Sequence, residues 1–255
     1  MSELYFSDIA FMIEVKNLVK TFADKVILSD ISFSIPHEQI VAIVGKSGAG
    51  KSVLLKCLIG LIKPDQGTIY LDNKLINSMS FRQLQTIRSQ IGMVFQFGAL
   101  FDSLNVAENI GLALRKLTKL TDYEIESRIK NSLESVDMSN TEELMPGELS
   151  GGMKKRIGIA RAIAIQPSYL FYDEPTTGLD PVMTDSINRL ILKIQENQQI
   201  TSVIITHELR TVYEVADRVI MLHDGRIEFD GKPNDLEKTE NKIVKQFITG
   251  DSTLV

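Results

Sequence analysis

Eight consecutive residues, 45–52, have the spacing of a phosphate-binding loop, G-x-x-x-x-G-K-S. The glycines let backbone N–H groups curl around phosphates, and a helix after the loop adds the positive end of its dipole. Lys51 can then reach the β- and γ-phosphates of a nucleotide, and the Ser52 hydroxyl can join the coordination of Mg²⁺. The alternative is a glycine-rich turn that binds nothing; the motifs below disfavour it. The candidate nucleotide-binding residues here are Gly45, Lys46, Ser47, Gly48, Ala49, Gly50, Lys51, Ser52 and Val53.

A second candidate anion site lies about a hundred residues further along the chain. Ser150, Gly151 and Gly152 stand immediately before a predicted helix that carries several Lys and Arg residues. A hydroxyl, flexible backbone amides and a helix dipole together favour binding of a phosphate. The simpler alternative is that Ser150 only caps the helix.

Two adjacent carboxylates, Asp173 and Glu174, follow the apolar run 169–172, which reads as a buried strand. Buried charges are costly unless they are paired or bind a ligand. One of the two carboxylates can hold Mg²⁺ through its water shell, and the other can orient or deprotonate an attacking water. Asp180 is the only charged residue of the following loop, 175–181.

Three further side chains are candidates for the same site. Gln96 and His207 each follow a predicted strand, where open α/β sheets place ligand contacts, although such residues often only satisfy the local backbone. Phe22 precedes a turn-like stretch, and its flat ring suits an adenine base. Taken alone, Phe22 is more often a core residue.

The elements that must position these residues alternate between strands and helices. Strands are predicted at 40–44, 68–71, 91–95, 169–172, 203–206, 218–222 and 226–229, and residues 12–35 read as short β elements. Helices are predicted at 53–61, 81–89, 106–117, 123–136, 184–196 and 240–248. The pattern becomes helical from 97 to 166, which indicates a helical subdomain inserted into an α/β core.

Composition limits the classes of function. The chain has 255 residues, a net charge of −5 and ordinary globular composition, so a dedicated nucleic-acid binder is disfavoured. Its single cysteine, Cys57, falls among apolar residues and reads as a core residue. The first eight residues show no secretion signal, and there is no apolar run of 18 residues, so the chain is not expected to span a membrane by itself.

With these motifs in this order, the chain resembles the nucleotide-binding subunits of ABC transporters over roughly residues 12–235. The sequence Leu-Ser-Gly-Gly-Met, 149–153, is the most discriminating feature. The resemblance implies a P-loop NTPase core with a mostly parallel sheet, an N-terminal antiparallel β subdomain and an inserted helical subdomain. The implied division is a core at 12–96 and 167–235, a helical subdomain at 97–166 and a C-terminal helical extension at 236–255.

The resemblance also implies roles for the residues above. ATP would lie between the phosphate loop of one copy and Ser150, Gly151 and Gly152 of a second copy in a homodimer. Phe22 would stack on adenine, and Gln96 would link Mg²⁺ to a membrane subunit. The remaining implied roles are polarisation of the attacking water by Glu174, contact with the γ-phosphate by His207, and contact across the dimer by Asp180.

A finer resemblance, to the ATPases of Mla/MCE-type lipid transport systems, rests on residues 97–102, 148–156 and 178–181. Met153, where glutamine is commoner in the wider family, agrees with that group. This finer resemblance implies that the subunit docks onto a membrane permease through residues 96–101, which include Gln96 and Phe101. It also implies an MCE-type lipid-binding protein as a further partner. The subunit would then lie at the cytoplasmic face of the inner membrane, held there by the permease.

Rival functions are an importer subunit for a polar solute such as an amino acid, a soluble ABC-type ATPase acting on DNA or ribosomes, and a regulatory ATP-binding module without hydrolysis. The second usually has two cassettes or a long coiled coil, and this chain shows neither. The third is disfavoured because Glu174 and His207 are both present.

Overall fold

A computed structural model describes residues 11–251 of the chain. The expectation about a secretion signal falls on the first residues and lies outside this range. Within 11–251, no helix has both the length and the apolar character needed to cross a lipid bilayer.

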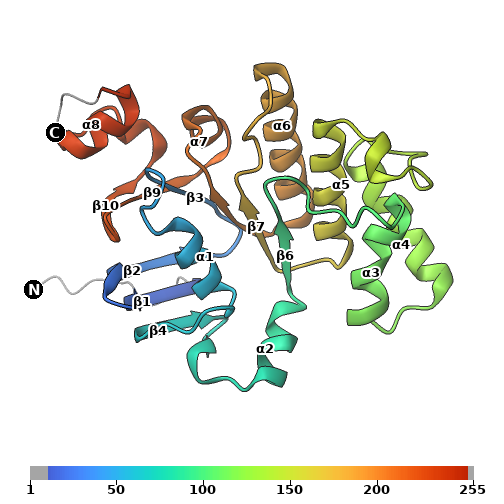
Figure 1. Cartoon of the computed structure of the whole chain (residues 1–255), viewed down its shortest axis with the longest axis horizontal. Helices are drawn as coiled ribbons and strands as arrows, with labels where there is room; N and C mark the ends of the chain where they lie inside the picture. Colours follow the sequence, from blue (N-terminus) through green and yellow to red (C-terminus); the bar gives the residue numbers. More distant parts are fainter. Residues whose placement is uncertain (1–10, 252–255) are drawn as a thin grey trace, which may run out of the picture.

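Two sheets form the framework of the molecule (Figure 1). The smaller sheet has the order β2-β1-β4-β5 and is antiparallel. Its strands are β1 (Phe11–Phe22), β2 (Lys25–Pro36), β4 (Gln66–Leu71) and β5 (Lys74–Leu75). The first two strands have 12 residues each, longer than the short elements that the sequence predicts, because they pair along almost their whole length through several register shifts.

The larger sheet has the order β10-β9-β3-β8-β7-β6 and is parallel except for β10. Its strands are β3 (Ile40–Val44), β6 (Ile91–Val94), β7 (Tyr169–Asp173), β8 (Thr201–Ile205), β9 (Arg218–His223) and β10 (Arg226–Gly231). All five residues of β3 and of β8 are buried, as expected for strands covered on both faces.

The helices are α1 (Lys51–Leu58), α2 (Phe81–Arg88), α3 (Val106–Leu117), α4 (Asp122–Ser135), α5 (Gly151–Ala164), α6 (Pro181–Gln198), α7 (Leu209–Val215) and α8 (Lys242–Thr249). Short 3₁₀ turns occur at Ile76–Ser78, Pro146–Glu148 and Pro233–Asp235. Side-chain caps define several helix starts, as Asn105 and Glu108 do for α3. Helix α7 was not predicted, because seven residues are too few to show a clear helical period.

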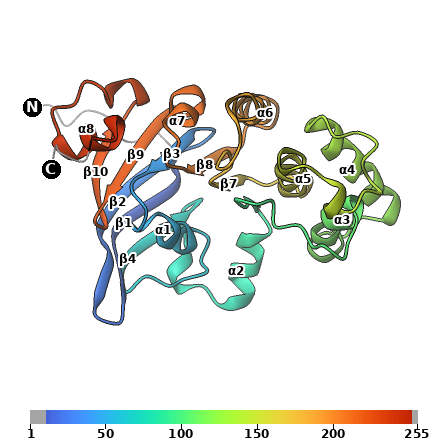
Figure 2. The same ribbon diagram turned by 45° about the horizontal axis from the view of Figure 1, so that its top comes forward.

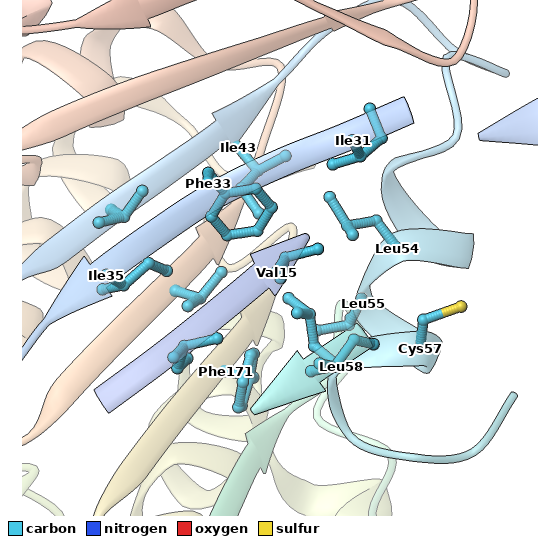
Figure 3. Close-up of a cluster of buried hydrophobic side chains, with 14 of the residues drawn as sticks. Val15, Ile31, Phe33, Ile35, Ile43, Leu54, Leu55, Cys57, Leu58 and Phe171 are labelled. Atoms are coloured by element: carbon cyan, nitrogen blue, oxygen red, sulfur yellow. The ribbon is translucent and has the colours of Figure 1, made fainter. Parts of the chain in front are cut away.

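Three apolar clusters hold these layers together. In the first, α1 lies between the two sheets and buries Leu54, Leu55 and Leu58 among strand residues such as Val15 and Ile43 (Figure 3). Cys57 is also buried there, as predicted, and burial raises the pKa of its thiol to about 11. The cluster fixes the start of α1, and therefore the phosphate loop, relative to the larger sheet.

The second cluster joins α3, α4, α5 and α6 to strands β6, β7 and β8. Helices α3, α4 and α5 gather at one end of the molecule, away from the antiparallel sheet (Figures 1 and 2). The third cluster packs α7 and α8 against β3 and β9. The predicted class, a P-loop α/β core with an N-terminal antiparallel sheet and a helical insertion, is confirmed by this architecture.

Candidate functional site

Four neighbouring parallel strands carry the predicted site residues at their carboxyl ends. The strands β3, β8, β7 and β6 lie side by side in that order. The phosphate loop follows β3, His207 follows β8, Glu174 follows β7 and Gln96 follows β6. The carboxyl ends of parallel strands share one edge of the sheet, so residues from four distant parts of the sequence meet there.

A cavity of about 820 Å³ opens at this edge. It gathers most of the predicted site residues, namely Gly45, Lys46, Ser47, Gly48, Gly50, Lys51, Ser52, Val53, Gln96, Asp173, Glu174 and His207. The other predicted residues lie outside its lining: Phe22, Ala49, Ser150, Gly151, Gly152 and Asp180. The volume lies in the range typical of small-molecule sites.

Glycine is required at two positions of the phosphate loop. Gly45 has φ +147°, and a Cβ atom there would lie 2.3 Å from the carbonyl oxygen of Leu222. Gly50 has φ +103°, and a Cβ atom would lie 2.8 Å from the side chain of Leu28. A side chain at either position would therefore force the loop away from the sheet or from β2.

Lys51 reaches back across the loop. Its ammonium group donates hydrogen bonds to the carbonyl oxygens of Gly45, at 2.5 Å, and Lys46, at 3.1 Å. Burial lowers the pKa of Lys51, while the charges of Glu174 and Asp173 act in the opposite direction. A phosphate in the cavity would supply the negative charge that favours the ammonium form.

The acidic pair is divided between two environments. Asp173 ends β7, and its pKa is raised by burial and by the neighbouring charge of Glu174. Glu174 adopts a left-handed backbone conformation with φ +52°, which turns the chain out of the sheet. Its two carboxylate oxygens have different partners: Oε1 lies 2.9 Å from Nδ1 of His207, and Oε2 accepts a hydrogen bond from the Thr177 hydroxyl at 2.8 Å.

The oxygen atoms of Ser52, Gln96 and Asp173 suit Mg²⁺, a hard cation that prefers oxygen ligands. All three residues line the same cavity. Within residues 11–251 no cluster of three His, Cys, Asp or Glu side chains could hold a metal. Mg²⁺ demands near-octahedral coordination, so nucleotide phosphates and water would supply the ligands beyond these three residues.

The segment 149–153, called the signature from here on, lies outside the lining of this cavity. Ser150 caps α5 by accepting a hydrogen bond from the backbone N–H of Met153 at 3.2 Å, and Ser150 and Gly151 are both exposed. This hydrogen bond is the capping alternative considered from the sequence, and Gly152 is buried next to it. A nucleotide in the cavity of the same chain does not meet these residues.

Asp180 and Phe22 are also outside the cavity. Asp180 is exposed and caps α6, accepting hydrogen bonds from the backbone N–H groups of Val182 and Met183. Phe22 is 46% exposed at the end of β1, and the ammonium group of Lys20 lies 5.2 Å from its ring centre. An exposed ring at this place is available for stacking, so its role stays a prediction.

The structure adds residues that the sequence does not indicate. Lys25, Ile27, Ile205 and Phe247 also line the cavity. Phe247 comes from α8, and the sequence predicts that helix without linking it to the nucleotide. The apolar alternation in β2 and the continuous apolar run in β8 predict burial but not contact with a ligand, so no local signal distinguishes these positions.

Comparison with known proteins agrees with this geometry. The family model described as ABC transporter matches residues 28–177. The chain is 39% identical to the probable ribonucleotide transport ATP-binding protein Mkl of Mycobacterium leprae, covering 93% of this chain and 69% of Mkl. It is 36% identical to the intermembrane phospholipid transport system ATP-binding protein MlaF of Escherichia coli, covering 95% of this chain and 90% of MlaF.

A solved structure gives the same result for the fold. The ATP-binding cassette MJ0796, a dimer in a post-hydrolysis state bound to ADP and Pi, superposes with a TM-score of 0.80. Its sequence is 32% identical, and the match covers 87% of this chain and 99% of the cassette. The chain therefore belongs to the ABC transporter family, as an ATP-binding and ATP-hydrolysing subunit.

Proposed function

We propose that this subunit hydrolyses ATP to power phospholipid transport through a separate membrane permease. The observation that carries the ATPase part is the cavity, which brings the phosphate loop together with Asp173, Glu174 and His207. The phospholipid part is supported by the similarity to MlaF over nearly the whole of both chains.

The complete ATP site is proposed to form between two copies of the chain. In each copy the phosphate loop lines the cavity, while Ser150, Gly151 and Gly152 lie outside its lining and the first two of them are exposed. A second copy can supply those amides to the γ-phosphate, as the dimeric state of the MJ0796 cassette suggests. Asp180, which is exposed beside α6, is proposed to contact the partner in this dimer.

Within one site, we assign the following roles. Lys51 and the loop amides bind the phosphates, and Phe22 stacks on adenine. Glu174 orients the attacking water and accepts its proton, and His207 contacts the γ-phosphate. Ser52, Gln96 and Asp173 would hold Mg²⁺, which when bound neutralises charge that develops on the phosphates.

The permease is proposed to dock beside residues 96–101. Phe97 is 75% exposed and Phe101 is 52% exposed, so this short segment presents two large apolar side chains to solvent. An apolar groove of about 220 Å³ is lined by Phe95, the residue just before this segment, and by Leu55 and Ile59 among others. Ser52 and Asp173 line both this groove and the ATP cavity, so a permease helix in the groove would be next to the Mg²⁺ ligands.

The docking segment, residues 96–101, is held against helix α5. Arg161 on α5 donates hydrogen bonds to the carbonyl oxygens of Gly98 and Ala99, both at 2.7 Å. A Cβ atom at Gly98 would lie 2.7 Å from the carbonyl oxygen of Lys154, so the segment crosses α5 closely. A force applied by a permease at Phe97 would therefore reach the helix that starts at the signature. Because residues 98 and 99 pack on α5, we propose that 97–166 forms one helical subdomain, as predicted from the sequence.

Docking would hold the subunit at the cytoplasmic face of the inner membrane, and an MCE-type lipid-binding protein is the proposed further partner. The name of Mkl refers to ribonucleotide transport and the name of MlaF to phospholipid transport. The alternative function to be tested is therefore ATP hydrolysis for an importer of a polar solute. Purification of the full chain from native membranes, followed by lipid and protein identification, separates the two. Co-purification of a permease with bound phospholipid is expected; a permease with a soluble-solute binding protein and no phospholipid would contradict the proposal.

A further inference from the structure

The loop that follows Glu174 is tied to the signature helix by one buried lysine. Lys155 on α5 is only 5% exposed. Its ammonium group donates hydrogen bonds to the carbonyl oxygens of Pro175, at 2.8 Å, and Thr177, at 2.7 Å. A buried lysine needs such partners, because an unpaired ammonium group away from water is costly.

The same loop residue that accepts from Lys155 also holds the catalytic carboxylate. The Thr177 hydroxyl donates a hydrogen bond to Oε2 of Glu174 at 2.8 Å, while Oε1 faces His207. The Glu174 side chain is only 14% exposed, so few waters compete for it. Since each carboxylate oxygen has one fixed partner, the plane of the carboxylate is fixed, and lone pairs remain for an attacking water.

Lys155 also connects the signature to this loop, because it lies on the helix that begins there. It lies four residues after Gly151, so both residues lie on the same face of α5. The loop is anchored on its other side by the buried pair Thr176 and Thr211, whose hydroxyl oxygens are 3.0 Å apart. A shift of α5 would therefore displace Thr177 through Lys155, while the neighbouring Thr176 stays held by Thr211.

We propose that Lys155 and Thr177 are positioning residues for ATP hydrolysis: Lys155 fixes the loop to the signature helix, and the Thr177 hydroxyl fixes the Glu174 carboxylate. The inference rests on the proposed role of Glu174 in orienting water. It adds a physical connection, within one chain, between the segment offered to the partner's ATP and the carboxylate that serves the chain's own ATP. Hydrogen bonds to charged groups are strong, so removing the bond from Thr177 to Glu174 should misplace the carboxylate. The turnover rate should therefore fall.

The test compares Thr177→Val, which keeps the shape and removes the donor, with Thr177→Ser, which keeps the donor. The full chain is used, and kcat and KM for ATP are measured together with ATP affinity. We expect Thr177→Val to lower kcat about tenfold or more, with ATP affinity within about twofold of the wild type, and Thr177→Ser to recover most of the rate. Unchanged kcat in Thr177→Val, or a loss that appears only in ATP affinity, would overturn the inference.

A second comparison separates positioning from folding. In a Glu174→Gln background, where the carboxylate is absent, adding Thr177→Val should lower the residual rate by less than about twofold. An additional loss as large as in the wild-type background would show that Thr177 acts without Glu174 and would overturn the inference. Lys155→Met should lower kcat in the same sense as Thr177→Val. If the wild-type chain itself fails to hydrolyse ATP, the proposed function fails rather than this connection.

Discussion

The side-chain oxygen of Gln246 accepts a hydrogen bond from the ammonium group of Lys46, so helix α8 is attached to the phosphate loop. Gln246 is only 8% exposed, and the next residue, Phe247, lines the ATP cavity. The two partners are 200 positions apart in the chain. Helix α8 therefore contributes to the cavity that we propose binds ATP.

Replacing Gln246 by Leu should weaken ATP binding about 2- to 10-fold, the range that one net hydrogen bond supports. The physical reason is that Lys46 and the loop lose a fixed point. Titration calorimetry with ATP measures the change. Lys242→Gln, an exposed position on the same helix, is the matched control and should keep wild-type affinity. Equal affinities for Gln246→Leu and wild type would contradict the role of α8.

Lys51→Ala should weaken nucleotide binding by at least about tenfold, because hydrogen bonds from a charged donor to phosphate contribute more than neutral ones. Fluorescent-nucleotide binding to the full chain is the measurement. Lys56→Ala provides a control in the same helix, since Lys56 lies outside the cavity lining. An ATP affinity that survives in Lys51→Ala would count against the phosphate-loop assignment.

Glu174→Gln should lower ATP turnover by about 100- to 10,000-fold while ATP stays bound, because the amide keeps the shape but cannot accept a proton from water. Trapped ATP should hold two copies together, so size-exclusion chromatography with ATP is expected to show a dimer. Thr177 and His207 can still hydrogen-bond to the amide, which limits structural damage. Normal hydrolysis in this variant would remove Glu174 from the mechanism.

Phe97→Asp should detach the subunit from its permease and leave ATP binding unchanged. The side chain is 75% exposed, so the change introduces a charge at the proposed interface without disturbing the core. Leu100 is a poorer choice in the same segment, because it packs against the helical cluster. Tyr123→Asp on α4, also at a highly exposed aromatic, is the control. Permease recovery by Phe97→Asp in a pull-down at wild-type levels would reject the docking surface.

Lys155 should make stability depend on pH. Burial lowers the pKa of its ammonium group to about 8, from 10.5 in the unfolded chain. Between these values the unfolded chain binds more protons, so the free energy of unfolding rises with pH. Relative to Lys155→Met, the wild type should gain at most about 2 kcal/mol between pH 7.5 and 9.5. Urea unfolding at both pH values measures this, with Lys154→Met as the control; a difference that stays constant would contradict it.

Much of the ATP site was predictable because its parts are local in sequence. The phosphate loop is eight adjacent residues between a β-branched strand and a helix, and both neighbours appear as β3 and α1. Outside the site, the predicted bounds of α3 match the structure, and its start is set locally by the caps Asn105 and Glu108. Asp173, Glu174, Gln96 and His207 could be placed together because each follows a strand of one parallel sheet.

Other features were decided only by tertiary packing. Periodicity predicts that α8 exists, but not that Gln246 meets Lys46 or that Phe247 lines the cavity. Lys155 sits in a run of basic residues that could all have faced water, yet the packing of α5 buries it against Thr177. Local sequence sets the conformation of each element, because caps, glycines and apolar period act over a few residues. Which side chains meet across the fold depends on how the elements pack, and no short stretch of sequence contains that information.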